Sequence, residues 1–241
     1  MASYTLLQRS KHFLYDLLYP PRCVSCRSAQ GWFCQTCVSK ISLIAPPICR
    51  HCGSPISTNG VPRCPECKSN PLQFIESIRS ASFFEDNPIR PAIHFLKYRN
   101  HQAVAAILGQ ILVNTYRTHH LKADVIIPVP LHPARLKERG YNQSELLARE
   151  MATILGLSVN TTSLQRVRKT KTQMQLGVLE RRQNVLDAFA CHQHDLVGQK
   201  VLLIDDVCTT GSTLDACAAV LKRAGVATVS GLTLARARFK S

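Results

Sequence analysis

The sequence predicts an α/β protein in which a mainly parallel sheet follows a small cysteine-rich metal module. Eight of the eleven cysteines lie in four C-x-x-C pairs between residues 23 and 67. After residue 122, short aliphatic runs alternate with helical patterns, which is typical of a parallel sheet covered on both faces. Two adjacent aspartates and a small hydroxyl-rich loop follow one of these runs. In such folds ligands bind beyond the carboxyl ends of the strands.

Composition limits the class of protein. The chain has 241 residues, 45% of them hydrophobic, so it can build a sizeable core and wholesale disorder is excluded. No apolar run approaches the roughly 20 residues that span a bilayer. Residues 1–18 carry Lys11, His12 and Asp16 and have no small-residue cleavage site, so we expect no signal peptide and a cytoplasmic protein. The net charge of +15 predicts a polyanionic partner such as nucleic acid, a nucleotide or a phosphorylated sugar.

Proline residues divide the chain into three parts. Leucines at helical spacing between Tyr4 and Leu18 predict a short amphipathic helix over residues 1–20, which ends at Pro20 and Pro21. The cysteine-rich module occupies residues 21–71 and ends near Pro71. Residues 72–241 then form the α/β domain.

The cysteine pairs predict two structural zinc ions. Each C-x-x-C pair aims two sulfurs at one point and supplies half of a tetrahedral four-thiolate shell. Sequential pairing gives C-x2-C-x7-C-x2-C and then C-x2-C-x11-C-x2-C, and an interleaved pairing would use the same residues. Disulfides are the alternative, but they do not fit a reducing cytosol. The eight ligands are Cys23, Cys26, Cys34, Cys37, Cys49, Cys52, Cys64 and Cys67.

We expect this module to fold only with metal, because it is short and poor in large aliphatic residues. A closed four-thiolate shell has no open coordination position, so we assign the module no catalysis. Gly53 is expected at positive φ in a knuckle. His51 lies between two ligands and is expected to face solvent or to support the ligands rather than to bind metal.

The α/β domain begins with a strand between residues 73 and 85. Asn142 is placed to cap a helix that ends before Gly156, because Glu145 follows it three residues later. Further strands are expected at 125–127, 201–204 and 227–234, and further helices at 89–99, 103–116 and 213–224. Cys208 and Cys217 are expected to be small core residues.

The segment from Val201 to Thr213 predicts a ribose-phosphate site. Backbone N–H groups at a helix N-terminus bind phosphate, and Gly211 lets the backbone approach it closely. Asp205 and Asp206 would repel phosphate but suit ribose hydroxyls or Mg²⁺. The alternative is an ordinary strand-to-helix turn, in which two adjacent acids would be unusual because like charges resist burial together.

These thirteen residues resemble the 5-phosphoribosyl-1-diphosphate (PRPP) signature of type I phosphoribosyltransferases. The whole chain resembles the ComF family of bacterial competence-associated proteins, which join a zinc module to such a domain. The motifs that carry this resemblance are the four cysteine pairs, Leu18–Pro21, Leu96–Tyr98, Pro128–Leu131, Arg139–Gln143 and Thr170–Leu176 with Arg181, Arg182, Asn184 and Phe189.

The resemblance implies a type I phosphoribosyltransferase fold and a role for each part of the site. Asp205 and Asp206 would bind the ribose 2- and 3-hydroxyls as the catalytic pair. The 5-phosphate loop would be Thr209, Thr210, Gly211, Ser212 and Thr213. The diphosphate loop, where this fold often has unusual peptide geometry, would be Pro128, Val129, Pro130 and Leu131. Residues that could close over the diphosphate are Arg139, Gln173, Arg181, Arg182 and Lys97.

Two functions follow from the resemblance. The first is Mg²⁺-dependent transfer of phosphoribosyl from PRPP to a nitrogen acceptor with release of diphosphate, linked to DNA uptake. The second is a non-catalytic, PRPP-sensing accessory protein that binds single-stranded DNA and other uptake proteins. Glutaminase activity is not supported, because the first cysteine is Cys23 inside a zinc knuckle. The basic stretch from Arg166 to Arg182 suits either a diphosphate or a solvated loop.

Overall fold

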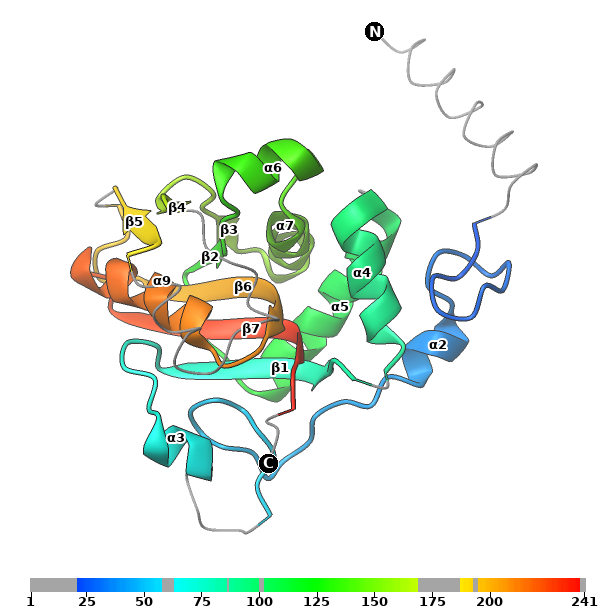
Figure 1. Ribbon diagram of the computed structural model, residues 1–241, viewed down its shortest axis with the longest axis horizontal. Coiled ribbons are helices and arrows are strands. Elements are labelled where there is room, and N and C mark those ends of the chain that lie inside the picture. The colour runs from blue at the N-terminus through cyan, green and yellow to red at the C-terminus, as the bar shows by residue number, and fades with distance from the viewer. Residues whose placement is uncertain are drawn as a thin grey trace, which may run out of the picture.

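The computed structural model describes residues 21–57, 63–85, 87–99, 102–168, 187–192 and 195–238. These residues form an α/β domain with two small cysteine-rich modules beside it (Figure 1). The helix expected over residues 1–20 lies outside the described residues, as do Gln173, Arg181 and Arg182.

A five-stranded parallel sheet forms the centre of the described α/β domain, so the expected fold class is confirmed. The strand order is β1-β7-β6-β2-β3. The strands are β1 (Ser77–Phe83), β2 (Val125–Pro128), β3 (Ser158–Val159), β6 (Lys200–Cys208) and β7 (Thr228–Arg236). A separate antiparallel pair contains β4 (Leu164–Arg166) and β5 (Phe189–Cys191).

The two longest strands, β6 and β7, lie in the interior of the sheet. Their aliphatic side chains are buried on both faces of the sheet. For this reason residues 201–204 are all hydrophobic instead of alternating between hydrophobic and polar. β6 extends to Cys208, further than the sequence pattern indicates. Asp205 and Asp206 therefore lie within β6, near its carboxyl end, rather than in a loop after the strand.

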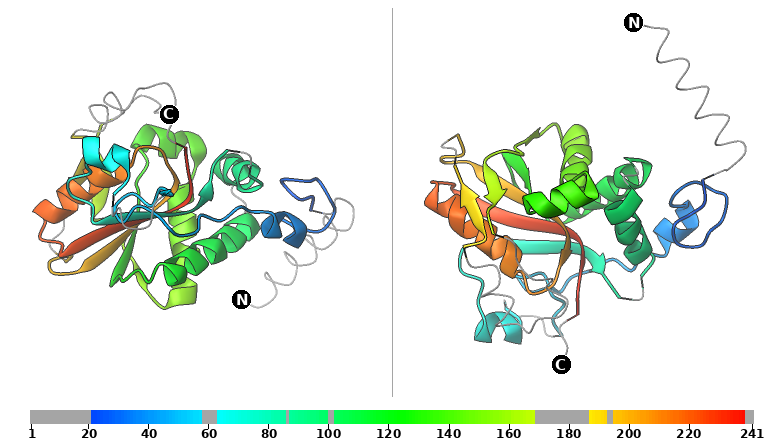
Figure 2. Two further views of the ribbon diagram at one scale, coloured as in Figure 1. Left: turned by 90° about the horizontal axis from the view of Figure 1, so that it is seen from below. Right: turned by 45° about the horizontal axis from the view of Figure 1, so that its top comes forward.

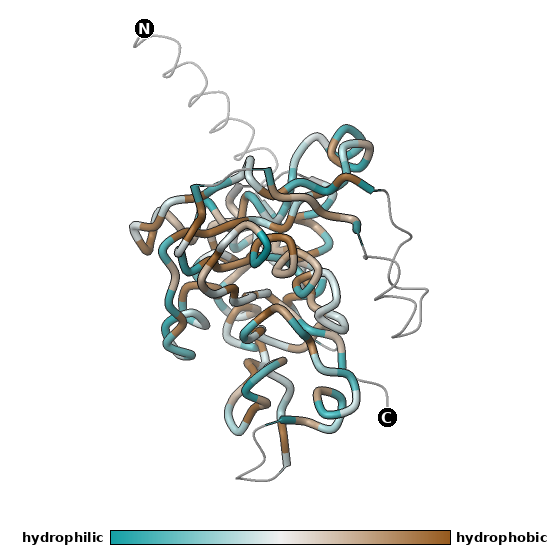
Figure 3. Tube along the Cα trace, turned by 90° about the vertical axis from the view of Figure 1, so that its left-hand side faces the viewer, coloured by the Kyte–Doolittle hydropathy of each residue, from teal (hydrophilic) through white to brown (hydrophobic). Residues whose placement is uncertain are grey.

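Helices cover both faces of this sheet (Figure 2). α5 and α7 pack side by side on one face with α4 next to them, and α9 packs on the other face together with β5. Figure 3 shows the hydrophobic stretches, in brown, concentrated in these layers. The helices are α4 (Ile89–Arg99), α5 (Gln102–Thr118), α6 (Pro133–Arg139), α7 (Gln143–Leu155) and α9 (Ser212–Arg223).

The expected caps of α7 are confirmed. The Asn142 side chain accepts a hydrogen bond from the Ser144 N–H at 3.1 Å, and Gly156 follows the helix with φ of 69°. Helix α6 was not expected, although Pro133 at its start and Gly140 after its end are the signals that mark such a helix.

The cysteine-rich segment runs along the free edge of β1. Toward the carboxyl end of β1, the Ile44 N–H donates to the Ala81 carbonyl at 2.8 Å. Near the amino end of β1, the Ile78 N–H donates to the His51 carbonyl at 2.7 Å. The module therefore satisfies backbone groups that the edge strand would otherwise expose. Two short helices belong to it, α2 (Gln35–Ser39) beside α4 and α3 (Pro65–Ser69) beneath β1 (Figure 1).

Candidate functional site

The structure gathers the eight predicted cysteines into two clusters by sequential pairing. The first cluster contains Cys23, Cys26, Cys34 and Cys37, and the second contains Cys49, Cys52, Cys64 and Cys67. Within each cluster all four sulfurs lie within 4.8 Å of one another. Two sulfurs in each cluster are 3.6 Å apart, against about 3.8 Å expected around a tetrahedral zinc with bonds of 2.3 Å. Both clusters therefore fit structural zinc.

The two clusters are built on the same local repeat. In the first, the Cys23 N–H donates to the Ser28 carbonyl at 2.8 Å, and Arg27 turns the chain at φ of 65°. In the second, the Cys49 N–H donates to the Ser54 carbonyl at 2.7 Å, and Gly53 has φ of 73°. In each cluster a short helix then starts at the third cysteine.

The second cluster is enclosed by residues of the α/β domain. The Arg236 side chain, which is 1% exposed, donates a hydrogen bond to the Cys52 carbonyl. His51 is buried, and its Nε2 forms a hydrogen bond with the Ile75 carbonyl at 2.9 Å. His51 therefore does not face solvent: it supports the knuckle, and it is not among the clustered ligands.

The carboxyl ends of β2 and β6 lie side by side. Pro128 pairs in register with Ile204, and the Val129 N–H donates to the Ile204 carbonyl at 2.9 Å. The predicted diphosphate loop, residues 128–131, is thereby placed next to the acid pair. Its peptide bonds are trans, since the one cis bond among the described residues joins Pro46 and Pro47.

Asp205 and Asp206 have opposite electrostatic environments. Burial and the charge of Asp206 raise the pKa of Asp205 to about 7, against the hydrogen bond that Asp205 Oδ1 accepts from Ser144 Oγ at 3.0 Å. Burial also opposes ionisation of Asp206, but the Lys97 ammonium outweighs it and holds the pKa of Asp206 below its usual value. The Lys97 Nζ lies 2.5 Å from Asp206 Oδ2.

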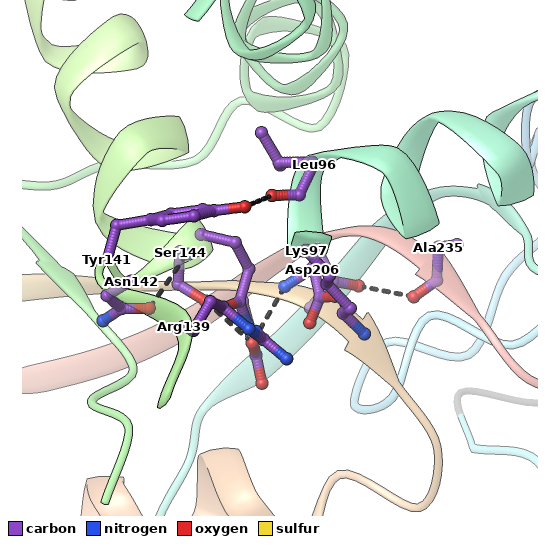
Figure 4. A network of polar contacts seen from close by, with 11 residues as sticks. Leu96, Lys97, Arg139, Tyr141, Asn142, Ser144, Asp206 and Ala235 are labelled. Carbon is purple, nitrogen blue, oxygen red and sulfur yellow. Dashed lines mark hydrogen bonds and ion pairs between the residues drawn. The ribbon is translucent and has the colours of Figure 1, made fainter. Parts of the chain in front are cut away.

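Helix α4 brings Lys97 to this pair, and Figure 4 shows the two side chains facing each other. The Tyr141 hydroxyl donates to the Leu96 carbonyl at 2.6 Å, which joins the segment before α7 to the end of α4. Lys97 is thus an ion-pair partner of Asp206.

The predicted 5-phosphate loop forms the turn between β6 and α9. Gly211 is the residue before the helix and has φ of 84°. The Thr210 and Ser212 hydroxyls are 2.7 Å apart, and the Ser212 N–H donates to Thr210 Oγ1 at 3.4 Å. The loop therefore combines the start of a 12-residue helix with neighbouring hydroxyls, which are the groups that phosphate binding uses.

A cavity of about 160 Å³ joins these parts. It is lined by residues that the sequence singled out, namely Lys97, Val129, Pro130, Leu131, Arg139, Arg166, Asp205, Asp206 and Thr213. It is also lined by Arg135 and Gln143, to which the sequence reasoning gave no role. Arg135 could have been found from its spacing, because it lies one helical turn before Arg139 on α6.

Comparisons with known proteins agree with this arrangement. Residues 14–68 match the double zinc ribbon domain family, and residues 95–239 match the phosphoribosyl transferase domain family. The chain is 33% identical to Competence protein F of Haemophilus influenzae over 90% of its own length and 97% of that protein. The chain belongs to the ComF family. Its α/β domain therefore has the phosphoribosyltransferase fold.

Further relatives extend the ComF match. DNA utilization protein YhgH of Escherichia coli K12 is 32% identical over 91% of this chain and 99% of its own. Competence protein ComFC of Bacillus subtilis is 27% identical over 84% of this chain and 83% of its own. No helix among the described residues of this ComF protein is long and apolar enough to span a membrane.

Two solved structures match part of the ComF chain. The glutamine PRPP amidotransferase of B. subtilis has a TM-score of 0.40 and 20% identity, over 58% of this chain and 30% of that one. The purine phosphoribosyltransferase of Pyrococcus horikoshii has a TM-score of 0.34 and 21% identity, over 54% of this chain and 70% of that one.

Proposed function

We propose that the cavity at the carboxyl ends of β2 and β6 binds PRPP and transfers its phosphoribosyl group to a nitrogen acceptor. One observation carries the proposal: strand β6 carries an acid pair near its carboxyl end and leads into the start of helix α9, and the acid pair lines a cavity that is also lined by cations. In this proposal residues 72–241 form the phosphoribosyltransferase domain and residues 21–71 the double zinc ribbon, preceded by a helix over residues 1–20. We place the protein in the cytoplasm, where its zinc ligands stay reduced.

Each part of PRPP has a partner in this arrangement. The 5-phosphate binds at residues 209–213, which supply hydroxyls and the backbone N–H groups at the start of α9. Asp205 and Asp206 accept hydrogen bonds from the ribose hydroxyls. The diphosphate lies along residues 128–131, where the cavity is lined by Arg135, Arg139 and Arg166.

The chemistry breaks the bond between ribose C1 and the diphosphate oxygen, and the electron pair leaves with the diphosphate. The lone pair of the acceptor nitrogen forms the new bond to C1. The arginines and Lys97 stabilise the charge that develops on the leaving group. The proton that the acceptor nitrogen loses passes to the departing diphosphate or to solvent.

Asp205 is also the residue that would hold a Mg²⁺ ion together with diphosphate oxygens. Its carboxylate is half-buried and lines the cavity, and carboxylate oxygens combined with substrate phosphates are the ligands that Mg²⁺ prefers. The ion would neutralise charge on the leaving diphosphate. Asp206 is less suited to hold it, because Lys97 already neutralises that carboxylate.

Calorimetry with PRPP and an assay of diphosphate release with a panel of bases and amines test this proposal. We expect PRPP to bind and at least one acceptor to give turnover that Asp205→Asn combined with Asp206→Asn abolishes. Asp124→Asn, an exposed acid at the other end of β2, is the control and should keep activity. PRPP affinity should rise from pH 6 to pH 8 as Asp205 ionises, and Asp205→Asn should remove that rise. Absence of PRPP binding would contradict the proposal.

A second function is favoured by one surface beside the cavity. Tyr98 is 63% exposed, and its ring lies under Arg139 at 5.6 Å and beside the His94 ring at 4.7 Å. Exposed aromatic rings with neighbouring cations suit single-stranded nucleic acid, because every base has a face that can stack. This surface, the net charge of +15 and the name of the relative DNA utilization protein YhgH favour a PRPP-sensing, DNA-binding accessory protein without turnover.

Fluorescence anisotropy with a labelled oligo-dT separates the two functions. The accessory function predicts binding that weakens steeply with salt, together with no diphosphate release from any acceptor. Replacing Arg168, Lys169 and Lys171 by Ala should then reduce DNA affinity; Lys169 and Lys171 lie outside the described residues. If these three bind only diphosphate, DNA affinity will survive the substitution.

A further inference from the structure

The second four-cysteine cluster lies against the elements that form the proposed 5-phosphate loop. In Figure 1 its loops and α3 lie beneath β1, on the side of the domain that also carries α9. The first cluster packs elsewhere, against α4 and α5. Three sets of contacts connect the second cluster to the loop.

The first connection passes through Ile78 on β1. Gly211 of the loop packs so closely on this residue that a Cβ at Gly211 would stand 2.8 Å from Ile78 Cδ1. The same Cβ would stand 3.1 Å from Leu72 Cδ1. The backbone that precedes α9 therefore rests directly on the side chains of Ile78 and Leu72.

The knuckle of the second cluster fixes the main chain of Ile78. The Ile78 N–H donates to the His51 carbonyl at 2.7 Å. A Cβ at Gly53 would stand 2.6 Å from the Ile78 carbonyl oxygen, so only glycine allows this approach. His51 lies between the ligands Cys49 and Cys52, and Gly53 follows Cys52. These two residues thus hold Ile78, on which Gly211 rests.

The second connection passes through Arg236. Its guanidinium donates to the Cys52 carbonyl, and its backbone pairs in register with Cys208, the residue before the loop. The Ala237 N–H donates to the Cys208 carbonyl at 2.9 Å. A four-thiolate zinc complex is dianionic, so the buried Arg236 cation balances charge at the cluster while its backbone holds the end of β6.

The third connection passes through Asp215 in the first turn of α9. Its carboxylate accepts hydrogen bonds from the backbone N–H groups of Gln73, Phe74 and Ile75, at 2.8 to 3.1 Å. These residues lead out of the second cluster into β1. The helix that presents its N–H groups to the phosphate is therefore tied to the chain that leaves the cluster.

The position of the knuckle depends on metal. Among the described residues of this module, its hydrophobic cluster contains Cys49, Cys52, Cys64 and Cys67, with Ile56 packed against it. Four cysteines and one partly buried isoleucine bury too little apolar surface to order the module without a metal ion.

We propose that the second four-cysteine site positions the 5-phosphate loop through Ile78, so that metal in this site and a ribose phosphate on the loop stabilise each other. The inference rests on the proposed function, because it takes residues 209–213 as the phosphate loop. Linkage requires the effect to be reciprocal: bound ribose phosphate raises the affinity for zinc by the same factor by which bound zinc raises the affinity for ribose phosphate.

Zinc release from the wild-type protein tests this coupling without any assay of turnover. The probe is ribose 5-phosphate, which carries the phosphate but lacks the metal-chelating diphosphate, and free ribose is the control. A chromogenic chelator records the loss of the two zinc ions. We expect ribose 5-phosphate to slow the release of one ion about tenfold, which is a typical coupling, and to leave the other unchanged. Cys26→Ser, which removes the first site, should retain the protected ion.

Ile78→Val isolates the coupling, because it deletes only Cδ1, the atom that meets Gly211. Its backbone bond to His51 remains, so this variant should keep both zinc ions and still bind ribose 5-phosphate. Ligand protection of zinc should fall in this variant. Ile111→Val is the matched control: Ile111 is buried in the other core, on α5, and its loss of the same methyl group should leave protection intact.

The outcomes separate the two proposals. If ribose 5-phosphate binds by calorimetry but changes neither release rate, or slows both equally, the coupling is wrong and the proposed site stands. If Ile78→Val keeps full protection, Ile78 is not the positioning residue. If ribose 5-phosphate and PRPP do not bind at all, the proposed function fails and the coupling fails with it.

Discussion

The two cysteine modules have the same local structure but attach to the α/β domain in different ways. The first attaches through apolar side chains: Trp32 packs against Phe95 of α4 with ring centroids 5.8 Å apart. The second attaches mainly through main-chain groups: the His51 carbonyl accepts from Ile78, and the carbonyls of Arg50 and Cys52 accept from the side chains of Arg79 and Arg236. A contact between side chains can adjust by rotamer changes, whereas a contact between main chains has no such freedom. Substitutions in the knuckle are therefore expected to be tolerated in the first module and not in the second.

Metal removal is expected to give the largest effect and to separate the two modules. Cys26 of the first cluster is exposed, whereas all four ligands of the second are buried. A chelator should therefore take the first zinc faster than the second. Because a structural zinc contributes about 10 kcal/mol or more, loss of both should unfold the modules. Chelator absorbance measures the release, and Cys26→Ser should lack the fast phase. Faster release of zinc from the second cluster than from the first would contradict this expected difference between the modules.

Gly53→Ala should give the next largest effect. The new Cβ would lie 2.6 Å from the Ile78 carbonyl oxygen at a positive φ, so the knuckle must leave β1 and lose its hydrogen bond. We expect a loss of about 3 kcal/mol from left-handed strain and the broken bond together. Urea unfolding followed by circular dichroism measures it. An unchanged midpoint would show that the main-chain contact is dispensable.

Trp32→Ala tests the side-chain attachment of the first module. Burial of an aromatic ring in a core contributes about 3–5 kcal/mol, and Trp32 is only partly buried. We expect a loss of about 2 kcal/mol in the same urea experiment, with both zinc ions retained. Trp32→Phe should recover most of this loss, because it restores a ring against Phe95. Loss of zinc from Trp32→Ala would mean that packing, and not only the thiolates, holds the first site.

Arg27→Gly should give the smallest effect. Arg27 occupies the same knuckle position as Gly53, at φ of 65°. Glycine relieves about 1 kcal/mol of left-handed strain but loses a similar amount through the entropy of the unfolded chain. A change within about 0.5 kcal/mol is expected. A large change in either direction would mean that the two knuckles differ locally as well as in their surroundings.

Local signals in the sequence predicted the parts of the fold that depend on local physics. Asn142 and Gly156 define the ends of α7, and the aliphatic run at residues 201–204 defines the central strand. The C-x-x-C spacing indicated four pairs, and the structure resolved their sequential pairing. The two-residue strand β3 was missed, because so short a pairing carries no periodicity.

Contacts between distant elements were beyond the reach of these signals. The ion pair of Lys97 with Asp206 depends on how α4 crosses the end of β6, and no spacing in the sequence indicates it. The buried state of His51 likewise follows from the docking of the knuckle on β1. Gly53 was expected to have a positive φ, and it does; its close approach to Ile78 is a second reason that only the structure reveals.

The covering of β1 has a consequence for how the protein behaves when zinc is scarce. Ile44 and His51 form hydrogen bonds with a strand that would otherwise be an exposed edge of the parallel sheet. An exposed edge strand can pair with strands of other molecules. Newly made chains that lack zinc should therefore self-associate rather than remain as inactive monomers, and the cysteine modules act as a built-in guard against aggregation as well as a scaffold.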